Sequence, residues 1–471
     1  MSIRVFDTYK RNKVEFRPLS PGQLKMYNCG PTVHDFAHIG NLRAYCFADT
    51  IRRWFENRGY DVLQVMNITD VDDKTIRKSR EKEIGLGDYT EQYRKAFMED
   101  LASLNILPAH VYPNATDHVD DMVRIIETLL EKGHAYRSED GSIYFNVKSF
   151  PEYGNLSGKR IEDLRVGERV RSDEYESKDD VRDFALWKAW DEDDGDVFWE
   201  TSLGKGRPGW HIECSAMSSR HLGPVFDLHT GGVDNIFPHH ENEIAQSRCS
   251  LDADFARHWM HVEYLIVEGR KMSKSLGNFF TLRDLLEQGW SAREIRYVLV
   301  GTHYRSQLNF TISSLESARQ SLARMDDFKQ SWSSWPEGES TPEALEALER
   351  ATSTFDAAMD DDLNVPQALA AVFTFIRSVN ALAVEGKTSS QFAADVREVW
   401  TRWNHALGLL EADDFATGEE IDSEWVEEQI LERQEARKAK DWARADEIRD
   451  ELLEAGIQLK DGPQGTTWKK I

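Results

Sequence analysis

Residues 24–41 read LKMYNCGPTVHDFAHIGN, and this stretch decides the fold. The apolar side chains at its beginning predict a strand that ends at Cys29 and enters a Gly-Pro turn. From Leu42 to Gly59 apolar side chains recur at roughly helical spacing, which predicts an amphipathic helix. A strand, a turn and a helix start in this order form a ready site for an anion, because the first N–H groups of a helix have no partner within the helix.

The four residues His38-Ile39-Gly40-Asn41 carry the chemistry of that turn. His38 can donate a hydrogen bond to a phosphate, and Gly40 lets the backbone come close to one. A histidine before a helix is also an ordinary cap or surface residue, so this pattern alone is weak. The segment Lys271-Met272-Ser273-Lys274-Ser275 strengthens it, because two lysines beside two hydroxyl groups make a mobile cationic arm suited to a triphosphate. The two motifs together predict a nucleotide site.

Four separated residues, Cys29, Cys214, His239 and Glu243, predict a metal site beside the nucleotide site. His239 and Glu243 are four residues apart, which places an imidazole and a carboxylate on one face of a helix. Two thiolates favour a soft or borderline metal, and zinc is the commonest choice. His240, three residues before Glu243, is an alternative ligand to His239. The other two cysteines, Cys46 and Cys249, are expected to be buried apolar residues.

Length and composition agree with a large soluble protein. The chain has 471 residues, enough for about three domains. The mean hydropathy is −0.58, and without an apparent apolar run near 20 residues we expect no membrane span. The N-terminus lacks the apolar core of a signal peptide, and four dispersed cysteines do not suggest a disulfide framework. A cytoplasmic location is therefore expected.

The chain is strongly acidic, with 83 acidic and 58 basic residues and a formal net charge of −25. The acidic residues are dispersed, as on an ordinary solvated face, but a surplus of this size suggests a halophilic host with a salty interior, where like charges are screened over a few ångström.

The remaining pattern predicts an α/β protein with a helical C-terminal part. Val62–Met66 and Val225–His229 are apolar runs suited to a parallel sheet, and Ser142–Phe145 is a short strand in a region interrupted by Gly, Pro and acidic residues. Leu- and Ala-rich helical patterns follow at residues 312–330, 343–360 and 366–384, with a further helix at 436–455 and a turn-rich end at 461–467.

The sequence resembles a known family, the cysteinyl-tRNA synthetases within the class I aminoacyl-tRNA synthetases. The class I signature pairs a His-Ile-Gly-His motif with Lys-Met-Ser-Lys-Ser, and Asn41 stands where the first motif has its last histidine. Asparagine can donate a hydrogen bond to a phosphate but carries no charge. The resemblance runs nearly end to end through these segments: Met26–Thr32, Asn67–Asp70, Arg207–Ser215, Phe237–Glu243, Lys271–Asn278 and Asp461–Trp468.

The resemblance implies a Rossmann-type parallel-sheet catalytic domain that is split by an insertion and followed by a helical bundle and a small anticodon-binding module. The expected segments are these: first catalytic half 1–112, connective insertion 113–206, second catalytic half with the zinc site 207–270, lysine loop and stem-contact region 271–318, helical bundle 319–415, and anticodon-binding module 416–471.

The resemblance also implies an activity. A monomer would activate L-cysteine with ATP and Mg²⁺ and transfer it to the terminal adenosine of tRNA(Cys), and one zinc ion per chain would select the cysteine thiolate. His38, Lys271 and Lys274 would be catalytic, and Gly40 and Asn41 would join them in binding ATP. The expected lining of the amino-acid pocket is Gly30, Thr69, Trp210, His229 and Asp234, with Asp234 facing the ammonium group.

Two other functions fit parts of the pattern. A related ligase that joins cysteine to an aminosugar would share the nucleotide and zinc motifs, but it lacks a terminal anticodon module. An RNA-binding protein with a structural zinc would need neither the lysine loop nor the nucleotide turn. A pyrophosphate exchange assay separates the second from an enzyme that activates cysteine.

Overall fold

The computed structural model describes residues 2–160, 180, 182–273, 276–410, 423–438, 441–454, 457–462 and 465–470. The chain divides into two compact units, Met1–Glu411 and Ala412–Ile471, and each is described by itself.

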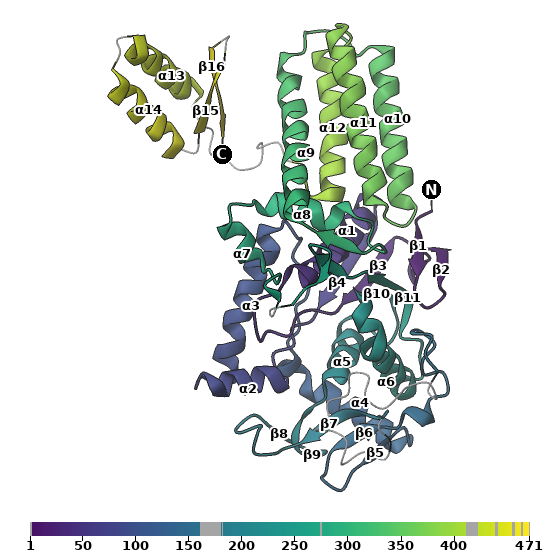
Figure 1. The fold of residues 1–471 in the computed structure, drawn as a ribbon. Helices are drawn as coiled ribbons and strands as arrows, with labels where there is room; N and C mark the ends of the chain where they lie inside the picture. Colours follow the sequence, from purple (N-terminus) through teal and green to yellow (C-terminus); the bar gives the residue numbers. More distant parts are fainter. Residues whose placement is uncertain are drawn as a thin grey trace. The chain divides into compact units, whose positions relative to one another are not determined.

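The centre of the first unit is a four-stranded parallel sheet in the order β11-β10-β3-β4 (Figure 1). Its strands are β3 (Gln23–Asn28), β4 (Asp61–Met66), β10 (Phe226–Gly232) and β11 (Ala256–Val262). Nearly every residue of β10 is buried, as expected for a strand that is covered on both faces. The strands predicted at 62–66 and 225–229 are thereby confirmed as β4 and β10.

Helices cover both faces of this sheet. Met26 packs in the core that contains α1 (Ile39–Asn57), whereas the next residue, Tyr27, packs in the core that contains α5 (Trp210–Leu222) and α6 (Glu241–Leu251). Successive side chains of a strand point to opposite faces, so these two cores lie on opposite sides of the sheet. The N-terminal hairpin of β1 (Arg4–Asp7) and β2 (Asn12–Glu15) contacts the edge strand β11.

Between β4 and β10 the chain forms a second, antiparallel sheet in the order β5-β6-β7-β9-β8. Its strands are β5 (Ala135–Arg137), β6 (Ile143–Phe145), β7 (Phe184–Ala189), β8 (Trp199–Thr201) and β9 (Gly204–Pro208). The same part of the chain contributes α2 (Asp73–Glu81), α3 (Leu86–Ser103) and α4 (Val119–Glu131). The strand predicted at 142–145 is confirmed as β6.

After β11 the chain forms a small sheet in the order β13-β12-β14 and two helices. These elements are β12 (Leu265–Val267), β13 (Arg270–Lys271), β14 (Leu308–Phe310), α7 (Leu282–Glu287) and α8 (Ala292–Gly301). β12 pairs antiparallel with β13 and parallel with β14.

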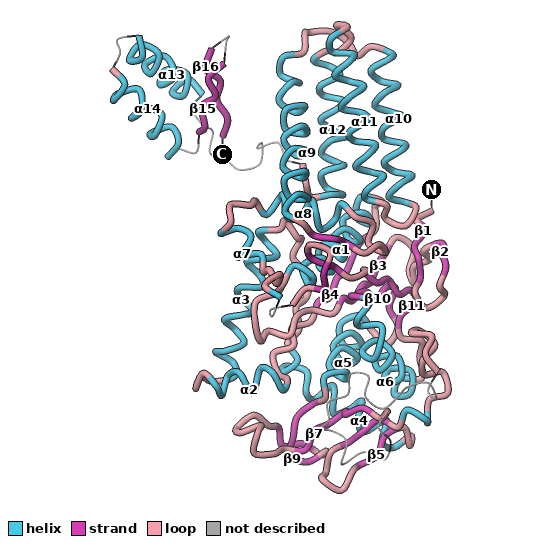
Figure 2. Tube along the Cα trace, in the orientation of Figure 1, coloured by secondary structure: helices cyan, strands magenta, loops and turns pink. Residues whose placement is uncertain are grey.

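Four long helices complete the first unit, and Figure 2 shows them as a bundle of helices without strands. They are α9 (Ile312–Ser331), α10 (Pro342–Asp360), α11 (Val365–Val384) and α12 (Ser390–Leu407). By length and composition α11 is apolar enough to cross a membrane. The expectation of no such run was therefore wrong, but α11 packs within the bundle against α10 and buries Leu369, Val372 and Phe375.

The second unit contains two helices and a β-hairpin. The helices α13 (Ser423–Lys438) and α14 (Trp442–Glu454) pack through Val426, Ile430, Ile448 and Leu452, and β15 (Ile457–Gly462) pairs antiparallel with β16 (Gly465–Lys470). The single helix predicted at 436–455 was wrong, because a new helix starts after Asp441, whose side chain accepts from Arg444 N at 3.2 Å. The turn-rich end is part of the hairpin.

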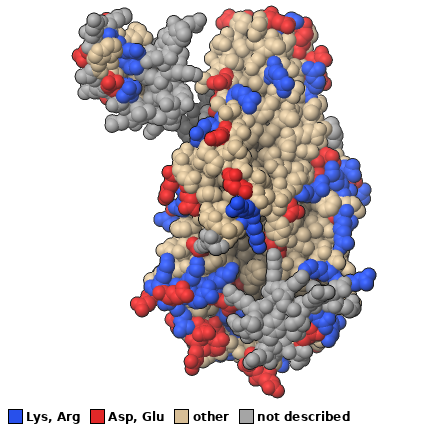
Figure 3. All heavy atoms as spheres, viewed as in Figure 1, with Lys and Arg blue, Asp and Glu red and all other residues tan. Residues whose placement is uncertain are grey.

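The predicted fold class, an α/β protein with a parallel sheet followed by helical parts, is confirmed. Acidic and basic side chains are interspersed on the face shown in Figure 3. The loops between the bundle helices carry the exposed carboxylates of Glu337, Glu339 and Glu385.

Candidate active site

A cavity of about 1020 Å³ opens at the carboxyl ends of the parallel strands, where ligands bind in sheets of this kind. β3, the first strand of this sheet along the chain, lies between β4 and β10, so the segment that follows β3 begins at the middle of this edge. Eleven of the predicted site residues line the cavity: Cys29, Gly30, His38, Gly40, Asn41, Thr69, Trp210, Cys214, Asp234, His239 and Lys271.

The four predicted metal ligands converge at one side of the cavity. Cys29 follows β3, Cys214 lies on α5 and Glu243 lies in the first turn of α6. His239 belongs to a single π-helical turn that precedes α6, so the two residues share a continuous helical segment but not one regular helix. The ligand atoms of all four residues lie within 4.8 Å of one another, and His239 Nε2 is 3.1 Å from Glu243 Oε1.

A second set of ligands overlaps the first. Cys29 and Glu243 also lie within 4.8 Å of His229 and His240. His229 Nε2 is 2.9 Å from Glu243 Oε2, and His240 Nε2 is 3.4 Å from Cys29 Sγ. The alternative ligand His240 is therefore close to the site, and the predicted pocket residue His229 lies behind Glu243.

Further histidines extend from the ligands, and of these His261 is buried and His211 is half-buried. His240 Nδ1 is 2.8 Å from His261 Nε2, His261 Nδ1 is 2.8 Å from Thr8 Oγ1, and His211 Nδ1 is 2.9 Å from His239 Nδ1. The sequence analysis did not single out His211 or His261. Seven of the 14 histidines lie between residues 211 and 261, and that concentration is a signal that could have found them.

Burial controls the charges of this cluster. It lowers the pKa of His229, His239 and His261 to about 3, so their imidazoles are neutral and offer lone pairs. Burial also raises the pKa of Glu243 to about 7 and that of the Cys29 thiol well above its usual value. A divalent cation would offset the cost of ionising these groups. Two sulfur donors, one imidazole and one carboxylate therefore fit a zinc ion in their chemistry.

The phosphate turn is built on the start of α1. His38 is the N-cap, and its Nδ1 accepts a hydrogen bond from Asn41 N at 3.2 Å, while Asn41 Oδ1 accepts from His38 N at 3.3 Å. This reciprocal pair is a capping box. Because Nδ1 of His38 is an acceptor here, the neutral ring carries its N–H donor on Nε2.

The amino-acid side of the cavity depends on close backbone packing. A Cβ on Gly30 would lie 1.7 Å from Asn67 O, so no larger residue fits there without a shift of the backbone. Gly30 N donates to Asn67 Oδ1 at 2.9 Å, and Thr69 Oγ1 is 2.7 Å from Glu213 Oε2. The Trp210 ring stacks on His239 with the centroids 4.4 Å apart. These contacts hold Gly30, Thr69 and Trp210 beside the metal ligands.

Of the two predicted lysines, Lys271 and Lys274, the structure describes the first. Lys271 lies in β13 and lines the cavity together with Met272. Lys274 lies outside the described residues.

Solved structures share the fold of most of this chain. The chain resembles a methionyl-tRNA synthetase of Mycobacterium tuberculosis in complex with methionyl-adenylate, with a TM-score of 0.61, 13% identity, and coverage of 82% of this chain and 92% of that chain. It also resembles a putative arginyl-tRNA synthetase of Campylobacter jejuni, with a TM-score of 0.56, 13% identity, and coverage of 83% and 94%. The fold is that of the class I aminoacyl-tRNA synthetases.

Sequence comparison defines the family. Residues 15–320 match the class I (C) tRNA synthetase catalytic domain, residues 354–411 the DALR domain, and residues 423–468 the cysteinyl-tRNA ligase anticodon binding domain. Cysteine–tRNA ligases of Protochlamydia amoebophila and Brachyspira hyodysenteriae are each 46% identical, over 99% of this chain and 98% and 99% of theirs. The chain belongs to the cysteinyl-tRNA synthetase family.

Proposed function

We propose that this chain activates L-cysteine with ATP and transfers it to the 3′-terminal adenosine of tRNA(Cys). In the first step a carboxylate oxygen of cysteine attacks the α-phosphate of ATP, and pyrophosphate leaves. In the second step the ribose 2′-hydroxyl attacks the acyl carbon, and AMP leaves. The residues act mainly by positioning the reactants and neutralising charge.

The phosphate turn and the lysine loop would bind ATP. The Gly40 N–H and the Nε2–H of His38 would face the phosphates beside the Asn41 side chain, because the backbone N–H groups of Ile39 and Asn41 already donate to Phe280 O and to the His38 ring. Lys271 and Lys274 would neutralise the charge that develops as pyrophosphate leaves. Mg²⁺ would accompany ATP as its counter-ion.

One zinc ion would be held by Cys29, Cys214, His239 and Glu243. When bound, zinc supplies a soft Lewis acid that prefers the thiolate of cysteine to the hydroxyl of serine. The chain's own residues orient the rest of the amino acid. Asp234 would accept from its ammonium group, and Gly30, Thr69 and Trp210 would enclose it, while His229 would support Glu243 from behind.

Such a site can discriminate without an editing domain. A site built to contact a polar group of its substrate rejects an analogue without that contact by about 10⁴- to 10⁵-fold. We propose that the protein acts as a cytoplasmic monomer.

The convergence of two thiols, an imidazole and a carboxylate at the cavity wall is the observation that carries this proposal. Cys214→Ser should lose the bound zinc and reduce cysteine-dependent ATP–pyrophosphate exchange by about 100-fold or more, because a hydroxyl is a poor zinc ligand. Zinc content per chain and the exchange rate are measured together. The matched control is Cys249→Ser, a change at a buried thiol outside the cavity. Full exchange activity in Cys214→Ser would contradict the proposal.

A further inference from the structure

Arg43 lies in the second turn of α1 and is 2% exposed. Its guanidinium donates to backbone carbonyls of two distant segments. Nη1 donates to Glu263 O at 2.7 Å and to Tyr264 O at 2.9 Å, and Nη2 donates to Ser306 O at 2.7 Å and to His303 O at 3.4 Å. The Arg43 side chain therefore joins α1 to residues 263–264 and to residues 303–306.

The two segments lead directly into the sheet that carries Lys271. Glu263 and Tyr264 precede β12, and His303 to Ser306 precede β14. β12 pairs with β14 on one side and with β13 on the other, where Ile266 lies opposite Lys271. Backbone hydrogen bonds from Glu263 N to Tyr304 O at 2.7 Å and from Leu308 N to Tyr264 O at 3.1 Å already join the two segments, and Arg43 ties this pair of strand beginnings to α1.

The other end of the lysine loop returns to the same helix start. Ile39 N donates to Phe280 O at 3.0 Å, and His38 forms a bridge with Thr281. Both ends of the loop are therefore attached to the first two turns of α1, which also present the phosphate turn. The start of α1 therefore holds the His38–Asn41 turn and both ends of the lysine loop next to each other.

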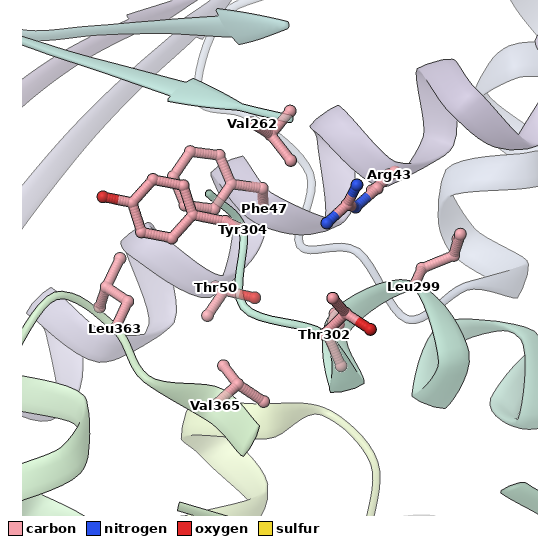
Figure 4. A pocket seen from close by; sticks show the side chains of 10 residues that line it. Arg43, Phe47, Thr50, Val262, Leu299, Thr302, Tyr304, Leu363 and Val365 are labelled. Atoms are coloured by element: carbon pink, nitrogen blue, oxygen red, sulfur yellow. The ribbon is translucent and has the colours of Figure 1, made fainter. Parts of the chain in front are cut away.

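The surroundings of Arg43 show why the four carbonyls matter. Arg43 points toward a small cavity of about 20 Å³, which is bounded by Phe47 and Tyr304 and by Leu363 of the connection between α10 and α11 (Figure 4). Arg43 Nε has no hydrogen-bond partner among the described residues. Burial lowers the pKa of Arg43 to about 10, so the group stays cationic at neutral pH. Its buried charge is stabilised mainly by the carbonyl dipoles of the two segments.

We propose that Arg43 is a positioning residue for adenylate formation, because it holds the sheet that carries Lys271 in register with the His38–Asn41 turn. The inference rests on the proposed function. A lysine could not replace this arginine, because its single ammonium has donors at one point and cannot span both segments as a planar guanidinium does. A misplacement of about 1 Å far from the reacting atoms can cost about 100-fold in rate.

The test compares Arg43→Lys with Arg296→Lys in the full chain. Arg296 is the control because it is equally buried and also joins separate backbone segments, donating to Leu407 O and Leu104 O at 2.9 Å, away from the lysine loop; unlike Arg43 it also pairs with the Asp49 carboxylate. Arg43→Lys should lower kcat for cysteine-dependent pyrophosphate exchange about 10- to 100-fold with the KM for cysteine unchanged. Arg296→Lys should lower the melting temperature and leave kcat unchanged below it.

Hydrogen exchange supplies a second readout. Amides of residues 263–268 and 306–310 should exchange faster in Arg43→Lys but not in Arg296→Lys. If Arg43→Lys does not fold, Arg43→Gln, which buries no charge, takes its place. An unchanged kcat in a folded Arg43 variant, an equal loss in both variants, or unchanged local exchange would overturn the inference. A wild-type chain without cysteine-dependent exchange would instead overturn the proposed function.

Discussion

Asn41 occupies the position where the family motif has its last histidine, and its side chain serves the start of α1. The amide oxygen of Asn41 accepts from the His38 backbone N–H, and the Asn41 backbone N–H donates to the His38 ring. Asparagine in place of histidine removes a side chain that could carry a positive charge. The His38 ring is still held, because its Nδ1 accepts from the Asn41 backbone N–H. We therefore expect the asparagine to affect the rate of adenylate formation and not the choice of amino acid.

Removal of the metal should make stability depend on pH through Glu243. Burial raises the pKa of this carboxyl to about 7 in the folded, metal-free chain, whereas in the unfolded chain it is about 4.3. A raised pKa contributes stability that is fully present below the unfolded pKa and is lost as pH rises through the folded one. The full loss is about 4 kcal/mol.

Urea unfolding of chelator-treated protein at pH 6 and pH 8.5 measures the last part of this loss, about 1.4 kcal/mol, because the rest occurs between about pH 4.3 and pH 6. Glu243→Gln is the matched control, because its amide does not ionise. The chelated wild type should be less stable at the higher pH than at the lower, and the variant should lack that part of the pH dependence. Equal pH dependence in both chains would exclude Glu243 as its source.

At the scale of elements, the sequence predicts best where the pattern is local. The helical patterns at 312–330, 343–360 and 366–384 match α9, α10 and α11 to within one or two residues, because their apolar faces recur regularly. α12 falls outside the predicted patterns. The metal ligands could be proposed from motifs, and the structure brings them together. The role of Arg43 could not, because its partners are backbone carbonyls distant in the sequence.

The first residue of α2 illustrates such a long-range contact. Asp73 pairs with Lys188 of β7 at 3.0 Å and with Arg207 of β9, which also binds Asp194 at 2.7 Å. Burial alone would raise the pKa of Asp73, but the two cations outweigh it and lower the pKa to about 2. These ion pairs fasten α2 to the antiparallel sheet.

Asp73→Asn should destabilise the protein by about 1 kcal/mol at pH 7, a small effect because the side chain is 42% exposed and solvent screens the pairs. A lowered pKa contributes stability above the unfolded pKa of about 3.9 that is lost as pH falls through the folded value. Urea unfolding should therefore show a constant difference from pH 7 to pH 5 that shrinks at pH 3. Asp88→Asn, at an exposed acid in the first turn of α3, is the control. An equal effect of both changes would rule out the ion pairs as the cause.

At the scale of the whole molecule, the division into two units separates the cavity from the part that matches an anticodon-binding domain. Every residue that lines the cavity precedes Glu411, and the anticodon-domain match begins at residue 423. The second unit has its own small apolar core. The two half-reactions should therefore be separable.

A chain that ends at Glu411 should retain cysteine-dependent pyrophosphate exchange within about two-fold, because it keeps all the residues proposed to bind ATP, cysteine and zinc. It should charge tRNA poorly at low tRNA concentration, since part of the binding surface is lost. Exchange and charging are measured on the same preparation, with the full chain as reference. Unimpaired charging at low tRNA concentration would show that the second unit does not contribute to tRNA binding.

The acidic surplus of 83 over 58 residues predicts a response to salt. Screening relieves repulsion among surface carboxylates, so the free energy of unfolding should rise from dilute buffer toward molar KCl. Binding of tRNA responds in the opposite direction, because salt weakens contacts with phosphates through counterion release. Charging should therefore reach its optimum at high salt, where the gain in stability exceeds the loss of tRNA affinity. Unfolding and charging are measured across one KCl series, with pyrophosphate exchange as the control that requires no tRNA. Maximal stability and activity in dilute buffer, with loss in molar KCl, would show that the acidity is not an adaptation to salt.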